Sequence, residues 1–200
     1  MWTGLVFAGG RSRRMGTDKA LIEIGGRSLL LRAVDLVRAA GGDPIVIGPP
    51  RPDPALRGVR QADESADGQE PSGPLPALRH GLSLCAAGRA AVALACDVPL
   101  VTAEFLRYLI GAASGWDAVV PRVAGEDQVL TAAYDPACLP VLDQALRRGE
   151  RAVHAALGGL RVRFLDEAAV APFGGAAMFL NVNTPADREQ AETALRERPR

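Results

Sequence analysis

The opening of the chain places glycines and cations together in a pattern that suits phosphate binding. An apolar run over residues 3–8 ends at Gly9 and Gly10, and the next nine residues contain four cations, Arg11, Arg13, Arg14 and Lys19. Glycine lets a phosphate approach the backbone N–H groups, and the cations neutralise its charge. The P-loop pattern is absent because Lys19 follows Asp18, and the glycines lack the GxGxxG spacing of dinucleotide sites. The pattern indicates either a nucleoside triphosphate site of another kind or a solvated basic turn.

Asp97 is the next residue whose position suggests chemistry. It follows the apolar run 90–96 and precedes Val98 and Pro99. A carboxylate at the end of a parallel strand faces the ligand-binding edge of an open α/β sheet, and Mg²⁺ prefers carboxylate and phosphate oxygens. Asp97 is therefore predicted to ligate magnesium on a nucleotide. The alternative is an aspartate that caps the turn after the strand.

Two asparagines, Asn181 and Asn183, stand just before Thr184 and Pro185. Their side-chain amides both donate and accept hydrogen bonds, which suits contact with a polar heterocycle or a second phosphate. The alternative is that Asn183 or Thr184 caps the helix that Pro185 opens.

The elements that must position these residues alternate between apolar runs and amphipathic segments. Strands are predicted over residues 3–8, 44–48, 90–96, 117–121, 129–134, 161–165 and 178–182, with a further short strand near Val59. Helices are predicted over residues 29–40 (capped by Ser28), 78–87 and 135–148, after Thr102, and from Pro185 onward. The segment 49–76 is predicted to be mainly an extended surface loop.

This alternation predicts an α/β fold with a Rossmann-like, doubly wound, mainly parallel sheet and helices on both of its faces. A single domain is expected over residues 1–195, with a frayed tail over residues 196–200.

Composition narrows the partners and the compartment. The chain is 48% hydrophobic and carries 23 basic and 23 acidic residues, which argues against a broad electrostatic surface for nucleic acid or membrane. Three cysteines, Cys85, Cys96 and Cys138, fit neither a CxxC motif nor a zinc ligand set and are expected to be reduced, mostly buried thiols. With no signal-peptide pattern and no apolar run that could span a bilayer, a cytoplasmic protein is predicted.

In combination, these motifs resemble a known family. Residues 5–19, LVFAGGRSRRMGTDK, are similar to the signature LAGGxSxRMGxDK of the molybdenum cofactor guanylyltransferases, the MobA family. Residues 73–75, 96–99 and 181–185 resemble later motifs of that family in the same order. The resemblance implies a nucleoside-diphosphate-sugar-transferase-like fold. It also implies transfer of GMP from GTP to molybdenum-carrying molybdopterin, which gives the guanine dinucleotide cofactor and pyrophosphate.

The resemblance further implies roles for individual residues. The nucleotide would be held by the segment Phe7, Ala8, Gly9 and Gly10, and its phosphates by Lys19 together with Arg14. Asp97 would hold the cofactor Mg²⁺, while Asn181 and Asn183 would lie toward the pterin. An aspartate ahead of the Gly-Pro-Leu motif would approach guanine, and this position is assigned to Asp63, with Glu64 and Asp67 as alternatives.

Departures from the family pattern and rival functions are also visible in the sequence. Phe7 replaces the usual leucine, Gly48 stands where an asparagine is usual, and Pro76 stands where many members have a small residue. The rivals are a cytidylyltransferase acting on the same cofactor, another small-molecule nucleotidyltransferase, and a non-catalytic nucleotide- or cofactor-binding protein. The family also implies a molybdenum-insertion protein and molybdoenzyme chaperones as partners. Ala8-Gly9-Gly10 favours guanylyl transfer, because cytidylyl relatives tend to carry Ala-Ala-Gly there.

Overall fold

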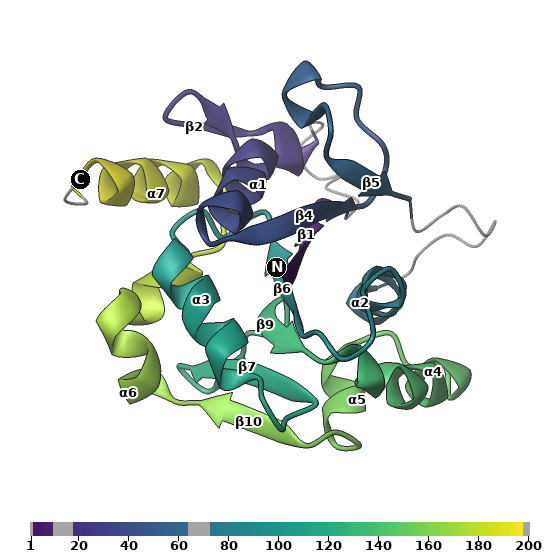
Figure 1. The fold of residues 1–200 in the computed structure, drawn as a ribbon. Coiled ribbons are helices and arrows are strands. Elements are labelled where there is room, and N and C mark those ends of the chain that lie inside the picture. Colours follow the sequence, from purple (N-terminus) through teal and green to yellow (C-terminus); the bar gives the residue numbers. More distant parts are fainter. Residues whose placement is uncertain (1, 10–17, 64–72, 198–200) are drawn as a thin grey trace.

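The computed structural model describes residues 2–9, 18–63 and 73–197 of the chain. The core of the molecule is a mixed, mostly parallel sheet (Figure 1). Its strands, in spatial order, are β10 (Val162–Leu165), β7 (Ala118–Val123), β9 (Thr131–Tyr134), β6 (Ala91–Ala95), β1 (Trp2–Phe7), β4 (Gly42–Ile47) and β5 (Arg60–Ala62). Strand β9 runs antiparallel to both β6 and β7, and the short β8 (Glu126–Asp127) also pairs with β7 in the antiparallel direction. The other neighbouring pairs are parallel.

Helices cover both faces of this sheet, each with its own apolar cluster. One cluster joins the sheet to α1 (Leu29–Ala39), α3 (Ala103–Ala112) and α6 (Glu167–Val170). The other joins it to α2 (Pro74–Ser83), α4 (Leu139–Arg147) and α5 (His154–Leu157). The predicted doubly wound α/β fold is therefore confirmed, with β9 and β8 as its antiparallel members.

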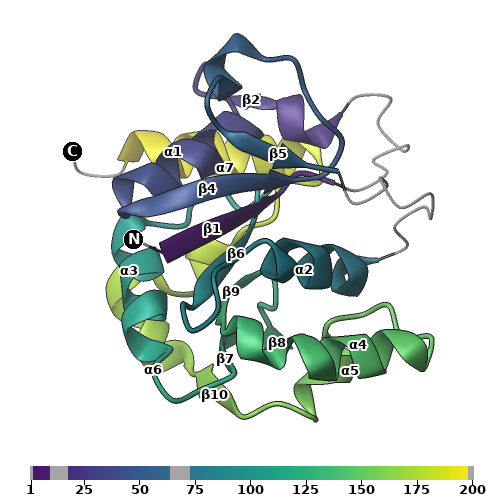
Figure 2. The ribbon, with the colours of Figure 1, turned by 45° about the vertical axis from the view of Figure 1, so that its right-hand side comes forward.

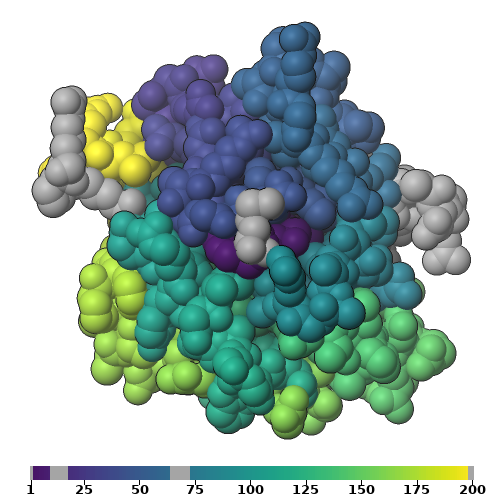
Figure 3. Space-filling model, in the orientation of Figure 1, coloured from purple at the N-terminus to yellow at the C-terminus, as the bar shows by residue number. Residues whose placement is uncertain are grey.

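Strand β1 lies at the centre because its side chains are apolar on both faces. Leu5 and Val6 are completely buried, and in the space-filling view only a small purple area of β1 is visible between its neighbours (Figure 3). Gly4 has a specific packing role, since a Cβ at this position would lie 2.5 Å from Val37 Cγ1 of α1. The missing side chain lets α1 pack closely against β1, as expected of a buried parallel strand beneath a crossover helix.

The C-terminal helix α7 (Pro185–Glu197) packs beside the hairpin formed by β2 (Glu23–Ile24) and β3 (Arg27–Ser28), close to α1 (Figure 2). A small apolar cluster joins the two, made by Ile24, Leu29, Leu100, Val182 and Ala191. The segment just before α7 thereby lies next to the turn η1 (Lys19–Leu21) and the end of β6, because Asn183 contacts Lys19 and Val182 N donates to Asp97 O. Residues from the two ends of the chain therefore meet at one edge of the sheet.

Several predicted elements form as expected, and the helix caps explain why. Ser28 Oγ accepts from Leu31 N at 3.3 Å and Thr102 Oγ1 accepts from Phe105 N at 3.2 Å, which satisfies N–H groups at the starts of α1 and α3. Asp135 also caps, but it opens the 3₁₀ turn η3 (Pro136–Cys138), and α4 follows from Leu139.

Other predictions were wrong. Residues 178–182 form no strand. Met178 and Phe179 belong instead to the 3₁₀ helix η5 (Gly175–Phe179), which Gly174 and Gly175 introduce at φ 124° and 59°, and residues 180–182 have no regular secondary structure. The expected short strand near Val59 forms as β5, but the rest of the segment 49–76 is more than a surface loop, because it also contains η2 (Pro54–Leu56) and the start of α2, with Arg51 and Leu56 buried. Helix α2 begins at Pro74, four residues before its predicted start at residue 78.

Several short elements were not predicted at all: η1, β2, β3, β8, α5, α6 and the 3₁₀ turn η4 (Ala171–Phe173). Helix α7 extends through Glu197, into the segment expected as a tail, and residues 198–200 lie outside the described part. Within the described residues, no helix is long and apolar enough to cross a membrane.

Candidate active site

Parallel pairing brings the ends of β1, β4 and β6 to the same edge of the sheet. Phe7 is in register with Ile47 of β4 and with Ala95 of β6. The pairing continues past the strand ends, because Ala8 N donates to Ile47 O at 2.9 Å and Cys96 N donates to Phe7 O at 3.1 Å. Gly9 and Asp97 each follow two residues after their strand, so the glycine-rich segment and the predicted metal ligand share this edge.

A cavity of about 290 Å³ opens at this edge. Its lining consists of Phe7, Ala8, Gly9, Asp18, Lys19, Ala20, Ala95, Cys96, Asp97 and Leu130. Five of these were predicted from the sequence to bind nucleotide or metal: Phe7, Ala8, Gly9, Lys19 and Asp97. The sheet thus brings together residues that are far apart in the sequence, since Lys19 and Asp97 are separated by 78 positions.

Lys19 is the centre of a polar cluster at the mouth of this cavity. Its Nζ donates to Asp97 Oδ2 at 2.5 Å and to Asn183 Oδ1 at 2.6 Å. The side chains of Lys19 and Asp97 are 20% and 23% exposed, so the ion pair remains accessible to a ligand. Asn181, with its amide oriented to satisfy both partners, donates from Nδ2 to Asp97 Oδ1 at 2.9 Å and Oδ2 at 3.0 Å. A carboxylate oxygen and an amide oxygen therefore converge on one cation position.

The start of α7 holds Asn183 in this place through a capping box. Thr184 Oγ1 accepts from Asp187 N at 3.2 Å, while Asp187 Oδ2 accepts from Thr184 N at 2.7 Å and from Asn183 N at 2.9 Å. These backbone hydrogen bonds lower the pKa of the Asp187 carboxyl. In addition, Val182 N donates to Asp97 O at 2.9 Å, which ties this segment to the end of β6. Thr184 is the capping residue, as the alternative reading of this motif expected, and Asn183 is free to face Lys19.

Gly48 explains one departure from the family pattern. Its φ is 139°, and a Cβ there would lie 2.8 Å from Gly9 N and 3.1 Å from Ala8 C. A side chain at this position would collide with the backbone of the glycine-rich segment. Glycine at residue 48 therefore lets the end of β4 pack directly against Gly9, and no side chain from this position can reach a ligand.

The remaining predicted residues are not part of this cavity or lie outside the described part of the chain. Asp63 directly follows β5 at the same edge of the sheet but does not line the cavity. Gly10, Arg14, Glu64 and Asp67 fall in the segments 10–17 and 64–72, which the structure does not describe.

Arg51 was missed by the sequence analysis because it lies in a proline-rich segment interpreted as a surface loop. Its side chain is only 9% exposed, and its guanidinium contacts Ala8, Asp18 and Pro49. Asp187 was also missed, although the Thr-x-x-Asp spacing before a helix is a local signal that could have identified it.

A second cavity, of about 330 Å³, adjoins the cluster on the side of α7. It is lined by Asp18, Leu21, Ile22, Val182, Asn183, Thr184, Pro185 and Arg188. Leu21 is a large apolar residue and is 49% exposed, which gives this cavity an accessible apolar wall. Asp18 lines both cavities, and the Lys19–Asn183 contact connects them.

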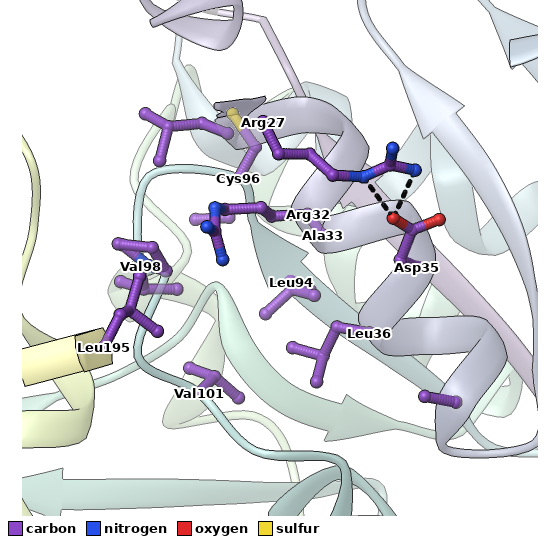
Figure 4. A pocket seen from close by; sticks show the side chains of 14 residues that line it. Arg27, Arg32, Ala33, Asp35, Leu36, Leu94, Cys96, Val98, Val101 and Leu195 are labelled. Atoms are coloured by element: carbon purple, nitrogen blue, oxygen red, sulfur yellow. Dashed lines mark hydrogen bonds and ion pairs between the residues drawn. The ribbon is translucent and has the colours of Figure 1, made fainter. Parts of the chain in front are cut away.

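A third cavity, of about 300 Å³, lies between α1, the segment after β6 and the end of α7 (Figure 4). Its floor includes Leu36, Leu94 and Val101, and none of the predicted site residues that the structure describes lines it. Its two arginines are already engaged. Arg27 Nε donates to Asp35 Oδ2 at 2.5 Å, and Arg32 Nε and Nη2 donate to Ile24 O at 2.8 and 2.6 Å.

Cys96 lines the first cavity but has no nucleophilic character. Burial, and then the neighbouring Asp97 carboxylate, raise the pKa of its thiol to about 12. The thiolate form that a nucleophile needs is therefore scarce at neutral pH. The charged side chains that line this cavity are Asp18, Lys19 and Asp97.

Comparison with known proteins places this geometry in context. A family model described as MobA-like NTP transferase domain matches residues 4–162. The chain is 34% identical to a molybdenum cofactor guanylyltransferase of Xanthomonas euvesicatoria, with 99% of this chain and 96% of the relative covered. It is 31% identical to a probable molybdenum cofactor guanylyltransferase of Pelotomaculum thermopropionicum, with 94% and 91% covered.

Solved structures show the same fold. Molybdopterin-guanine dinucleotide biosynthesis protein A from Archaeoglobus fulgidus superposes with a TM-score of 0.78 at 21% identity, covering 98% of this chain and 100% of that one. The 2-C-methyl-D-erythritol 4-phosphate cytidylyltransferase from Thermus thermophilus superposes with a TM-score of 0.72 at 20% identity and the same coverage. At these identities the likeness extends to the fold alone.

Proposed function

Because this chain belongs to the MobA-like NTP transferase family, we propose that it transfers GMP from GTP to molybdenum-carrying molybdopterin and releases pyrophosphate. The observation that carries the proposal is the convergence of Lys19, Asp97 and Asn183 beside the end of strand β1, which Gly9 follows. A cation and oxygen donors at the carboxyl edge of a parallel sheet suit a nucleoside triphosphate.

The reaction needs the protein to align the two substrates more than it needs covalent catalysis. A phosphate oxygen of the acceptor attacks the α-phosphorus of GTP, and the bond from that phosphorus to the bridging oxygen breaks. Pyrophosphate leaves with the electron pair. The attacking oxygen is already ionised at neutral pH, so the protein must hold two anions in line and neutralise charge on the leaving group.

On the nucleotide side, the first cavity offers the backbone of Phe7, Ala8 and Gly9 together with the Lys19 ammonium. We assign Lys19 to the phosphates. Its ammonium now lies on Asp97 and Asn183, and its release from them makes it available to the triphosphate. Arg14 and Gly10 remain assigned to the nucleotide, and Asp63 to the base, by family resemblance.

The donor set fits magnesium. Asp97 Oδ2 and Asn183 Oδ1 are hard oxygen donors that already converge on one positive charge, the Lys19 ammonium. Asp97 and Asn183 would hold the ion together with phosphate oxygens. When bound, the ion supplies positive charge to the phosphates and holds them in place. Asn181, which donates to both Asp97 oxygens, orients that carboxylate.

On the acceptor side, we assign the second cavity to the pterin substrate. It adjoins the cluster through Asn183, and its exposed Leu21 offers an apolar surface for a flat ring system. Asn183 and Thr184 supply polar groups, and Arg188 supplies positive charge for an anionic acceptor. The two cavities thus provide donor and acceptor sites on either side of Lys19.

Pyrophosphate release with GTP, CTP and ATP as donors, in the presence of Mg²⁺ and molybdopterin, tests the proposed function. We expect the fastest release with GTP and none without the acceptor. A preference for CTP would overturn the guanylyl assignment in favour of the cytidylyl rival. Normal nucleotide binding with no metal-dependent turnover would instead support a non-catalytic binding protein.

A further inference from the structure

Arg51 is the one charged residue that is buried in the described part of the chain, and its guanidinium donates hydrogen bonds to three different residues. Nη2 donates to Ala8 O at 2.7 Å, Nε donates to Asp18 Oδ2 at 2.9 Å, and Nη1 donates to Pro49 O at 3.0 Å. A second ion-pair contact, from Nη2 to Asp18 Oδ2, measures 2.8 Å. Burying a guanidinium is costly unless it is fully paired, so a side chain held in this way fixes the groups around it.

The groups that Arg51 holds flank the glycine-rich segment. Ala8 follows the end of β1, and Asp18 precedes η1, the turn that begins at Lys19. Asp18 uses its two oxygens for different partners. Oδ2 pairs with Arg51, whereas Oδ1 accepts from Ala20 N at 3.1 Å and caps η1. One carboxylate therefore connects the buried guanidinium to the turn that carries Lys19.

The backbone of Arg51 is fixed as well. Gln61 Oε1 accepts from Arg51 N at 2.8 Å, and Gln61 Nε2 donates to Arg51 O at 3.0 Å. Gln61 belongs to β5, so the guanidinium is anchored to the sheet and not to a free loop. This reciprocal pair of bonds gives Arg51 a rigid base from which to hold Ala8 and Asp18.

We propose that Arg51 is a positioning residue for triphosphate binding, which acts through Asp18 to place Lys19 at the mouth of the nucleotide cavity. The inference rests on the proposed function in one respect, namely that Lys19 contacts the phosphates. Arg51 itself lines neither of the two cavities at the cluster, so it acts on the ligand only through its partners.

The competing explanation is a buried ion pair that only stabilises the fold. A purely structural role predicts that an Arg51 substitution lowers the affinity for every ligand equally, and that this effect persists when Lys19 is substituted as well. A positioning role predicts a loss of affinity that is confined to ligands with phosphates and that depends on Lys19. A double-mutant cycle with ligands that contain or lack phosphates separates the two.

The experiment uses calorimetric binding of GTP and of guanosine to the wild type, Arg51→Lys, Lys19→Met and the double variant, at a temperature where all are folded. Lysine keeps the charge but lacks the planar fork that reaches Ala8 and Asp18 together. We expect Arg51→Lys to weaken GTP binding at least about tenfold, the range for losing charge-assisted hydrogen bonds, and to change guanosine binding less than about twofold. In the Lys19→Met background, Arg51→Lys should have no further effect on GTP.

Two further variants complete the design. Asp18→Asn keeps an oxygen to cap Ala20 but removes the charge that Arg51 pairs with, and it replaces Arg51→Lys in the cycle if that variant fails to fold. Arg161→Lys changes an exposed arginine that pairs with Asp117, far along the chain, and should bind GTP as the wild type does.

Equal weakening of guanosine and GTP, or an undiminished effect of Arg51→Lys in the Lys19→Met background, would overturn the positioning role. Tighter binding of CTP than GTP by the wild type would contradict only the guanylyl assignment, and the same cycle run with CTP would then decide the role of Arg51. A wild type that binds no triphosphate would overturn both.

Discussion

Arginine and lysine pair with aspartate at two regions of the sheet, and the pairs differ in their surroundings. At the site edge, defined by Ala8, Asp18, Lys19, Arg51, Asp97 and Asn183, each charged group has several partners from different elements. At the distal edge, defined by the ion pairs in and beside β7, β8 and β10, the arginines are exposed and pair with single carboxylates, Arg122 with Asp127 and Arg161 with Asp117.

Exposure and connectivity explain what each region can do. The Arg161 side chain is 71% exposed and that of Arg51 is 9% exposed, although both hold an aspartate at 2.8 Å. An exposed pair exchanges water contacts for a weak, screened attraction. A buried, multiply bonded charge fixes its neighbours, and losing one partner leaves the others uncompensated. We therefore propose that the same residue types position a ligand at the site edge, whereas at the distal edge they form exposed surface pairs.

The largest effect is expected from a substitution that breaks the cluster at the site edge. Asp97→Asn keeps the shape of the side chain but removes the charge that pairs with Lys19 and would hold magnesium. We expect Mg²⁺-dependent pyrophosphate release to fall at least about 100-fold, as for loss of a group that stabilises transition-state charge. The matched control is Asp127→Asn at the distal edge, which should keep full activity. Comparable losses in both variants would remove the distinction between the two regions.

A smaller effect is expected from a substitution that tests how tightly the site edge is packed. Gly48→Ala introduces a Cβ 2.8 Å from Gly9 N in a backbone conformation, φ 139°, that only glycine adopts readily. We expect the free energy of unfolding to fall by about 2–4 kcal/mol from strain and overpacking together. Gly158→Ala is the control, because nothing lies within 4 Å of its Cβ, and it should change stability by less than about 0.5 kcal/mol. Denaturant unfolding measures both, and equal stability would show that residue 48 tolerates a side chain.

A still smaller effect is expected at the distal edge. Hydrogen bonds from the side chain and backbone of Arg161 lower the pKa of Asp117 below its ordinary value of 3.8. Because this folded-state pKa is depressed, the stabilisation is present above pH 3.8 and is lost as the pH falls through the folded-state value. Asp117→Asn should therefore cost less than about 1 kcal/mol at neutral pH, and the difference from wild type should vanish in strong acid. Thermal unfolding across this pH range would contradict the assignment if the difference grew on acidification.

The smallest effect concerns thiol chemistry, which should not distinguish the two regions. Burial raises the pKa of Cys96, in the site cavity, and of Cys138, beside α4, to about 12 in each case. Cys85 is less buried. At pH 8, a thiol reagent followed by mass spectrometry should label Cys85 first and the other two only on unfolding. Rapid labelling of Cys96 in the folded protein would contradict the inert thiol described here.

The sequence predicted the parts of the site edge that depend on local signals. Gly9 after an apolar strand, Asp97 at a strand end and Thr184-Pro185 at a helix start are each recognisable within a few residues. The alternating pattern was also sufficient for the doubly wound sheet, because buried parallel strands are continuously apolar. Boundaries were less accurate, as the early start of α2 shows.

The rest depended on long-range contacts that no local pattern contains. Lys19 and Asn183 are 164 residues apart, and nothing near either residue indicates that they meet. Arg51 is a charged residue among prolines, and only the folded chain reveals the three acceptors that make its burial possible. Residues 178–182 are apolar enough for a strand, but after the positive-φ glycines Gly174 and Gly175 the 3₁₀ helix η5 extends to Phe179, and residues 180–182 have no regular secondary structure.

The central claim is nucleotidyl transfer at the site edge, and the fate of labelled phosphate tests it most directly. GTP labelled at the α- or the γ-phosphorus would be incubated with the protein, Mg²⁺ and molybdopterin. The α-label should appear in the pterin product and the γ-label in pyrophosphate, and both should form at least about 100-fold more slowly with Asp97→Asn. Transfer of the γ-label to the acceptor, or its release as inorganic phosphate, would contradict the claim.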